Sequence, residues 1–538
     1  MKKNSFMEGA VIATIGIILV KVIGLIYVIP FNALVGETGG ALYGYGYNIY
    51  QLFLAISSAG FPFAISKITS EYLALNNTTA VYNTYKIATK LIIVISVIAF
   101  VILFLFAPNI ARLIKGNAVG GNSINDIAFV IRIISFAILV VPFLSVTKGF
   151  LQGHKYITPT TISQLIEQIV RVIVILLGTY LALKVFDLGM RNAIGIAVFG
   201  AFIGGLAAFI YLRIKIKKSN ILKKVSCDDE GIKKQIIRKI IIYSVPFIVI
   251  SLIYNLYNTV DMILVSRTMN DILKIDANIT ESVISVFTTW GIKLNNIILA
   301  ITTGLTTSLI PNIVSSYTSG NKKDVNNKFN ASLQCILLLI VPATIFLSLL
   351  VQPVWTLFYG KSVYGPIVYK AFVFTALFGG LHSVVVNTLQ GLSKYRLVIT
   401  SVLIGLLINT VLDVPFMLLV NKFGMEPSWG AIYAAIIGYS VSMIISLSVL
   451  KNKYKFDFND TIKRIPSYIL TWIVFIFIIL LLKLFIPTYL TSRLMQIPIL
   501  LLYGAVSFAI YLALNYYMGN LYLFKELRRR KNDSRNSQ

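Results

Sequence analysis

Two lysines lie inside apolar runs that are long enough to cross a membrane. Lys21 is central in residues 12–30, and Lys293 is followed closely by Asn295 and Asn296 in a second run. A charge at membrane depth costs about 2.5–3.5 kcal/mol on insertion scales, so it usually faces protein or a water-filled cavity. Two deep cations predict a cavity that attracts phosphate, pyrophosphate or carboxylate. Snorkelling or internal pairing remains the alternative for Lys21, and polar contact between helices the alternative for Lys293.

A second polar set lies on two other apolar runs. Glu167 and Arg171 are four residues apart, so they share a helix face and can pair. We expect either substrate binding or packing from this pair. Asn255, Asn258 and Asp261 recur at three-residue spacing and predict one polar stripe. Asn255 is a candidate for substrate binding, whereas Asp261 is expected at a wet rim.

Two further pairs have four-residue spacing. Lys67 and Glu71 lie at the end of an apolar run and predict a cytoplasmic gate or an interface pair. Asn409 and Asp413 have the chemistry to bind a cation or a neighbouring helix, and packing is the favoured interpretation.

The elements that position these residues are transmembrane helices. The chain has 538 residues, 57% of them hydrophobic and 13% charged, with a mean hydropathy of +0.82. About 20 apolar residues span the bilayer core as a helix, and in lipid the backbone must pair internally. We therefore predict an all-α polytopic membrane protein of fourteen helices, at 6–29, 43–66, 87–107, 126–147, 158–183, 192–212, 240–264, 283–308, 332–351, 370–392, 397–420, 429–450, 466–486 and 497–518.

The distribution of Lys and Arg predicts the orientation. With fourteen spans both termini lie on one side, and the loops on that side hold roughly threefold more Lys and Arg than the others. Both termini are therefore predicted to be cytoplasmic. This asymmetry and contact with anionic lipid also account for the net charge of +28, so no nucleic-acid partner is expected.

Weak internal repeats predict two lobes. The motif at 151–153 recurs at 389–391, and the Ser58-Ala59-Gly60 element resembles Thr302-Thr303-Gly304; both pairs are six spans apart. An even offset keeps the orientation, so the lobes are parallel and enclose a central cavity. The predicted organisation is an N-lobe (1–217), a basic cytoplasmic linker (218–239), a C-lobe (240–450), two further helices (451–518) and a basic cytoplasmic tail (519–538).

Catalytic and cofactor signals are missing from the sequence. Two cysteines and two widely spaced histidines do not suggest a metal site, and Gly360-Lys361-Ser362 lacks the upstream glycine of a phosphate-binding loop. Glu37 alone is poor support for a glycosyltransferase. We expect no cofactor, no metal and no enzymatic activity.

Three segments carry a resemblance to a known family. KVIGLIYVIP (21–30), GETGGALYG (36–44, expected as a loop) and AGFPFAISK (59–67) resemble the start of the MurJ and Wzx polysaccharide-lipid flippases. These belong to the multidrug/oligosaccharidyl-lipid/polysaccharide exporter (MOP) superfamily. The resemblance covers essentially the whole chain and is nearest to YtgP-type MurJ proteins, with stage V sporulation protein B as a relative.

The resemblance implies a flippase for lipid II, the undecaprenyl-pyrophosphate-linked peptidoglycan precursor. It implies that cations on the first, second and eighth helices meet the pyrophosphate, and that the last two helices form a groove for the lipid tail. Lys21 matches the first-helix position and Lys293 lies near the eighth-helix position. The chain departs from the pattern at residues 53–56, which are apolar, and at Tyr27.

These observations together predict a flippase of the bacterial plasma membrane that works by alternating access. Its expected partners are an anionic lipid-linked oligosaccharide, membrane lipids and proteins of cell-wall synthesis. The alternatives are a Wzx-like or sporulation flippase for another glycan, a drug antiporter of the MATE type, a polytopic glycosyltransferase and a cell-wall scaffold.

Overall fold

The protein is helical throughout the part of the chain that the structure describes. The computed structural model describes residues 6–219, 221–222, 230–487 and 492–521. Thirteen helices or joined helix pairs in these ranges are long and apolar enough to cross a membrane, and Ile12–Ile26 is a shorter apolar helix. The predicted class, an all-α polytopic membrane protein, is confirmed.

The packing of the chain divides it into two compact units. The first contains Met1–Lys293 and Thr410–Leu419, and the second contains Leu294–Asn409 and Val420–Gln538. The first unit thus includes the predicted N-lobe together with the next two helices of the chain. The predicted lobe boundaries themselves remain a prediction.

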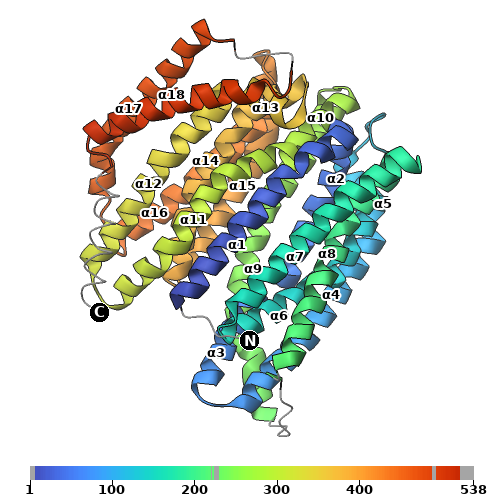
Figure 1. Cartoon of the computed structure of the whole chain (residues 1–538), viewed down its shortest axis with the longest axis vertical. Coiled ribbons are helices and arrows are strands. Elements are labelled where there is room, and N and C mark those ends of the chain that lie inside the picture. The colour runs from blue at the N-terminus through green and yellow to red at the C-terminus, as the bar shows by residue number, and fades with distance from the viewer. Residues whose placement is uncertain (1–5, 220, 223–229, 488–491, 522–538) are drawn as a thin grey trace. The chain divides into compact units, whose positions relative to one another are not determined.

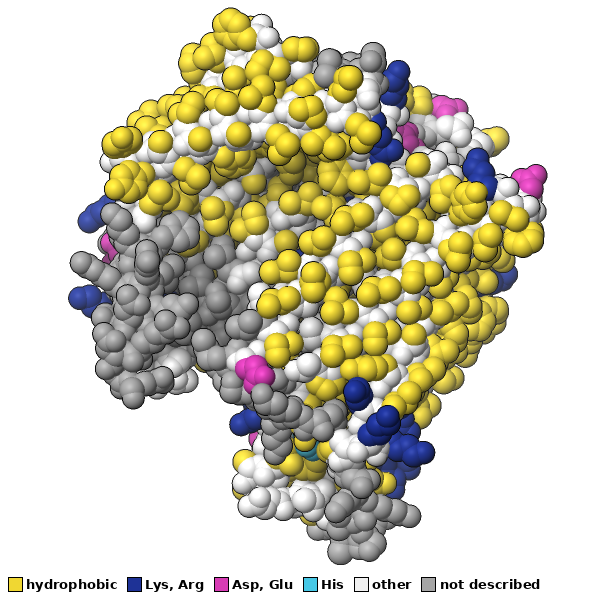
Figure 2. Space-filling view, viewed as in Figure 1, with side chains coloured by type: hydrophobic (Ala, Val, Ile, Leu, Met, Phe, Trp, Pro, Cys, Tyr) yellow, Lys and Arg dark blue, Asp and Glu magenta, His cyan; other side chains and the backbone are white. Residues whose placement is uncertain are grey.

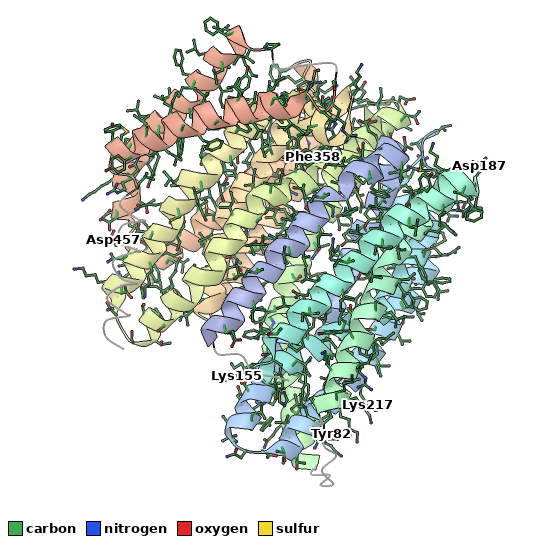
Figure 3. All side chains as sticks on the ribbon, viewed as in Figure 1. Tyr82, Lys155, Asp187, Lys217, Phe358 and Asp457 are labelled. Carbon is green, nitrogen blue, oxygen red and sulfur yellow. The ribbon has the colours of Figure 1, made fainter. Side chains whose placement is uncertain are left out.

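The first unit is a bundle in which successive helices run between two ends (Figure 1). Within it, α1 packs on α7, α2 on α9 and α10, and α4 on α5 and α9. In Figure 3, Tyr82, Lys155 and Lys217 lie at one end of this bundle and Asp187 at the other. Its helices are α1 (Phe6–Ile26), α2 (Val28–Ser58), α3 (Phe61–Ala74), α4 (Thr78–Lys115), α5 (Ile124–Ser135), η1 (Phe136–Leu139), α6 (Val141–Gly153), α7 (Ile157–Ile173), η2 (Val174–Gly178), η3 (Leu181–Val185), α8 (Gly189–Ser219), α9 (Glu230–Arg267), η4 (Thr268–Ile272) and α10 (Ala277–Thr288).

The second unit is built around α12, α14 and α16. Helix α14 packs on both α12 and α16, while α17, drawn in red in Figure 1, packs on α12 and on α18. Tyr468, Phe475, Tyr503 and Tyr511 form an aromatic part of the core between α12, α17 and α18. Residues 290–293 of α11 and 410–419 of α15 belong to the first unit, and the rest of these two helices to the second. The helices are α11 (Trp290–Thr318), α12 (Lys322–Leu349), α13 (Val351–Tyr359), α14 (Tyr364–Gly391), α15 (Tyr395–Lys422), α16 (Ser428–Asn452), α17 (Asn459–Phe485) and α18 (Gln496–Tyr517).

The expectation that residues 36–44 form a loop is wrong. They belong to α2, which is interrupted only at Gly36, where φ is +64°. Glycine tolerates this left-handed conformation without steric cost. Gly40, further along the helix, allows close packing, because a Cβ atom at this position would lie 2.3 Å from Nε1 of Trp290.

Candidate functional site

Lys21 lies on a helix that packs directly on the helix carrying Glu167 and Arg171. Two glycines make the contact between α1 and α7 close. A Cβ atom at Gly16 would lie 2.1 Å from Cγ2 of Thr161, and one at Gly24 would lie 3.4 Å from Nε2 of Gln168. Lys21 lies between these glycines and is half-buried. The fold therefore holds this cation beside α7.

Glu167 is the centre of a buried ion network. Its Oε1 atom lies 2.7 Å from Nη2 of Arg171, as the four-residue spacing predicts. Its Oε2 atom lies 3.0 Å from Nζ of Lys148, on α6. All three side chains are only 14–16% exposed. One carboxylate thus balances two cations, so the network keeps a net positive charge.

Lys293 lies at the start of α11, next to the same group of tyrosines as Arg171. Its Nζ atom is 5.3 Å from the ring centroid of Tyr27, which is within cation–π range. The charge of Arg171 acts both on Lys293 and on Tyr47. Lys293 and Arg171 therefore belong to one electrostatic environment, although they are on different helices.

The tyrosines form a continuous aromatic row along α2. Tyr43 and Tyr47 stack with centroids 5.5 Å apart, and Tyr47 and Tyr50 lie 5.8 Å apart. Phe31 contacts both Tyr43, at 5.3 Å, and Trp290, at 5.8 Å. The row fixes the position of the helix break next to Lys293. Sequence reasoning missed Lys148 and this aromatic row, although the glycine and tyrosine alternation of residues 43–47 is a visible signal of close packing.

The side-chain amides of Asn295 and Asn255 donate hydrogen bonds to residues that are not part of the Glu167 network. Asn295 is 5% exposed and its Nδ2 atom donates to Oγ1 of Thr375, at 3.1 Å, and to the Phe372 carbonyl, at 3.3 Å. It therefore joins α11 to α14. Asn255 donates to the Ser251 carbonyl of its own helix, at 2.8 Å, and Asn296 is half-buried. Substrate contacts of these three residues stay predictions.

Lys67 and Glu71 both contact α9 instead of forming their predicted pair. Glu71 accepts hydrogen bonds from Nζ of Lys239, at 2.8 Å, and from the hydroxyl of Tyr243, at 3.2 Å. Nζ of Lys67 lies 4.0 Å from the centroid of the Tyr243 ring. The reason is that α3 packs on α9, which brings Tyr243 between the two charges. The role of Lys67 and Glu71 as a gate stays a prediction.

A second connection joins α9 and α10 to the opposite end of the first six spans. Glu281 accepts hydrogen bonds from the backbone N–H of Asn122, at 2.5 Å, and from its Nδ2 atom, at 2.9 Å. Asp271 accepts from the backbone N–H of Asn117, at 3.2 Å, and pairs with Arg267, at 3.1 Å. No pattern in the sequence pointed to Glu281. We call the Asn122–Glu281 contact the outer latch and the Glu71–Lys239–Tyr243 contact the inner latch, after the sides on which the topology predicted from the sequence puts them.

Asp261 and Asp413 form a buried carboxyl pair. The expected wet rim at Asp261 is wrong, because this residue is 9% exposed and Asp413 is fully buried. The two carboxyl groups interact with each other. Two adjacent buried carboxylates do not both keep a negative charge unaided, so the chemistry fits a shared proton or a monovalent cation held by oxygen atoms.

Comparisons with known proteins show the family. The family model for polysaccharide biosynthesis proteins matches residues 6–272. The lipid II flippase MurJ of Bacillus subtilis (strain 168) is 33% identical over 96% of this chain and 96% of its own length. Stage V sporulation protein B of the same organism is 23% identical over 83% of each chain.

Solved structures show the same fold. The lipid II flippase MurJ in an inward closed conformation superposes with a TM-score of 0.63 at 18% identity, covering 94% of this chain and 99% of that one. An inward-facing MATE transporter of the MOP superfamily gives 0.59 at 14% identity, covering 82% and 94%. The chain therefore belongs to the MurJ family of the MOP superfamily, a family of multi-pass membrane transporters and not of enzymes.

Proposed function

We propose that this protein moves lipid II, or a closely similar undecaprenyl-pyrophosphate-linked cell-wall precursor, from the inner to the outer leaflet of the bacterial plasma membrane. The observation that carries the proposal is the 33% identity to a lipid II flippase over 96% of both chains. Transport by alternating access fits the fold shared with MATE transporters, which present their site to one side of the membrane at a time.

The charges of the buried network support an anionic headgroup. Lys148, Arg171 and Lys293 carry three positive charges against the single negative charge of Glu167, and Lys21 lies on the helix that packs on Glu167 and Arg171. A pyrophosphate carries several negative charges and accepts charge-assisted hydrogen bonds from Lys and Arg. We propose that Lys21, Arg171 and Lys293 bind the pyrophosphate while Glu167 positions Arg171.

The topology that we propose has fourteen spans and both termini in the cytoplasm. The loops at the Lys155 and Lys217 end of the first unit carry the excess of Lys and Arg that marks the cytoplasmic side. In this orientation the inner latch closes the cytoplasmic side and the outer latch closes the outer side. The last two helices, with the aromatic core beside them, are proposed as the groove for the polyprenyl tail.

A flippase for a different lipid-linked glycan is the second candidate. The similarity to stage V sporulation protein B favours it, as do the apolar residues at 53–56, where the family pattern has a cation. The tail and pyrophosphate chemistry would be the same, and only the sugar would differ.

Depletion of the protein in its own bacterium, followed by measurement of the precursor on each leaflet, tests the proposal. Lipid II is expected to accumulate in the inner leaflet, and wild-type protein is expected to restore it to the outer leaflet. Lys21→Ala is expected to fail at normal abundance, whereas Lys322→Ala, an exposed lysine at the start of α12, is expected to complement. Normal lipid II export in depleted cells contradicts the substrate, and complementation by Lys21→Ala contradicts the role of that cation.

A further inference from the structure

A surface cavity of about 570 Å³ lies at the basic end of α8. Arg213 and Lys217, one helical turn apart, are its charged lining residues, and Phe209, Ile210 and Ile214 supply apolar surface. The cavity contains none of the residues of the proposed transport site. Its lining combines two cations with an adjacent apolar wall, which is the chemistry of an amphiphile with a small anionic head.

Among the described residues, Arg213 contacts neutral groups. Its Cζ atom lies 5.9 Å from the centroid of the Phe209 ring, and its Nη1 atom lies 3.5 Å from the hydroxyl of Tyr85 on α4. Tyr85 is fixed in turn by the hydroxyl of Thr147, at 3.3 Å. Within the described ranges neither Arg213 nor Lys217 forms an ion pair with Asp or Glu. Among the described residues, no carboxylate neutralises these two positive charges.

The cavity lies where a membrane-facing surface ends. Ile210 and Ile214 are each 49% exposed, although they are apolar. In Figure 2 the hydrophobic surface over α7 and α8 ends in a group of Lys and Arg side chains, in the region where Figure 3 labels Lys217. At such a boundary a phospholipid headgroup would meet the two cations, with its first acyl carbons against the isoleucines.

The start of α9 repeats the same arrangement. A second cavity, of about 500 Å³, is lined by Lys234 and Arg238, again four residues apart, and by Ile237, Ile241 and Ile242. On α9 the isoleucines lie between and after the two basic residues, and on α8 Ile210 and Ile214 lie before and between them. On both helices the apolar residues are therefore on the side of the basic pair that leads into the span. The two cavities thus have the same chemistry and lie on the two helices that flank residues 220–229. This repetition argues against a chance grouping of basic residues.

We propose that the α8 cavity binds an anionic phospholipid of the bilayer, with Arg213 and Lys217 on the phosphodiester and Phe209, Ile210 and Ile214 on the acyl chains. The α9 cavity is proposed to bind a second molecule of the same lipid. The apolar wall favours a lipid over free phosphate, and the presence of only two cations in each cavity disfavours a polyanion. The proposal does not rest on the transported substrate.

Native mass spectrometry of the full-length protein tests it, with phosphatidylglycerol and phosphatidylcholine as the probes. Wild type is expected to retain phosphatidylglycerol over phosphatidylcholine. The double variant Arg213→Gln/Lys217→Gln is expected to lose one of the two retained phosphatidylglycerol molecules, with affinity at the α8 cavity falling roughly 10- to 30-fold, since each basic side chain near the surface contributes about a fivefold effect. Lys322→Gln/Lys323→Gln removes the same charge from an exposed helix start and is expected to retain wild-type binding.

Three results would overturn the proposal. These are equal retention of both lipids by wild type, unchanged phosphatidylglycerol retention in the Arg213→Gln/Lys217→Gln variant, and an equal loss in the control. Inorganic phosphate is added as a competitor for the bound lipid. Displacement of the lipid at millimolar phosphate would contradict a contribution of the acyl chains to binding. The charge-conserving swap Arg213→Lys/Lys217→Arg is expected to keep the lipid, which separates lost charge from lost folding.

Discussion

Both carboxylate oxygens of Glu281 accept hydrogen bonds from a single residue, Asn122, through its backbone N–H at 2.5 Å and its side-chain Nδ2 at 2.9 Å. The contact leaves no spare room, because a Cβ atom at Gly121 would lie 2.6 Å from Oε1 of Glu281. Asn122 also donates to the Thr38 carbonyl, at 2.9 Å, so the latch joins three segments of the first unit. A transporter that opens outward through this side must break it.

Weakening the outer latch is expected to favour the outward-open state. Glu281→Gln keeps one acceptor oxygen and Glu281→Ala keeps none, so the effect should increase in that order. The probe is Thr288→Cys, at a position on α10 that is 7% exposed and packs against Gly44 of α2, in protein whose two native cysteines are replaced by alanine. Labelling by a membrane-impermeant thiol reagent is expected to rise several-fold in Glu281→Ala, because the latch no longer holds α10 closed.

Glu426→Gln is the control for that experiment. Glu426 lies between α15 and α16 and accepts from the hydroxyl of Ser428, at 3.2 Å. Burial raises the pKa of Glu426, so this carboxyl resembles Glu281 in being shielded but is not part of the latch. Equal labelling in all variants, or a rise in Glu426→Gln alone, would contradict the latch.

Gly60 and Gly304 are predicted to respond oppositely to alanine. The sequence repeat pairs them, but a Cβ atom at Gly60 would lie 2.2 Å from the Ser244 carbonyl oxygen, whereas nothing lies within 4 Å of one at Gly304. Backbone atoms of α9 do not move aside as a flexible side chain does. Gly60→Ala is therefore expected to destabilise the protein by about 1–3 kcal/mol. Gly304→Ala is expected to be neutral or to stabilise by up to about 1 kcal/mol.

Thermal unfolding of the two alanine variants in the same detergent measures this difference. Gly60→Ala should unfold at a lower temperature than wild type, and Gly304→Ala at the same or a higher one. Similar unfolding temperatures of the two variants would contradict the different packing described for Gly60 and Gly304.

Local patterns in the sequence predicted helices and neighbours on one helix face. The Glu167–Arg171 pair is present because both residues are on one uninterrupted turn of α7. Lys67 and Glu71 have the same spacing, yet Glu71 bonds to Lys239, which is 168 residues away in the chain. A four-residue spacing permits a pair but does not exclude a better partner on a neighbouring helix. Hydropathy alone carries no information about that partner.

The breaks within helices could not be predicted from the sequence either. Span eight is divided into α10 and α11 at Thr289, which has φ −132° and ψ −72°. Thr289 is held by a hydrogen bond from its hydroxyl to the Gly40 carbonyl, at 2.8 Å. This conformation depends on a contact between residues 249 positions apart, and no local preference of the sequence encodes it.

Removing the charge of Glu167 is expected to make the protein depend on an anionic ligand. In Glu167→Gln the cations Lys148 and Arg171 lose their shared carboxylate while remaining largely buried. Breaking one partner of a buried ion network typically costs about 3–5 kcal/mol. A pyrophosphate bound at the same place would supply the missing negative charge.

Thermal stability with and without undecaprenyl pyrophosphate measures this effect. Without the lipid, Glu167→Gln should unfold well below wild type. With it, the gain in unfolding temperature should be larger in the variant than in wild type. The double variant Glu167→Gln/Arg171→Gln restores the charge balance and should lose this extra gain. A gain that is equal in all three proteins would place the pyrophosphate elsewhere.

The carboxyl pair of Asp261 and Asp413 is expected to make the folded protein sensitive to small cations. Both groups are buried and interact with each other, so a monovalent cation between them would relieve their repulsion in the folded state only. A ligand that binds only the folded state raises stability by mass action. At a fixed alkaline pH and equal ionic strength, Na⁺ or Li⁺ is expected to raise the unfolding temperature by roughly 2 °C or more over choline. Asp413→Asn removes the repulsion and one ligand, so its unfolding temperature should not depend on the cation.

Asp187→Asn, at an exposed turn of the first unit, is the control and should respond to the cation as wild type does. Unfolding is measured without substrate, so this test does not depend on which lipid is transported. A cation response that survives in Asp413→Asn would exclude this carboxyl pair as the cation site.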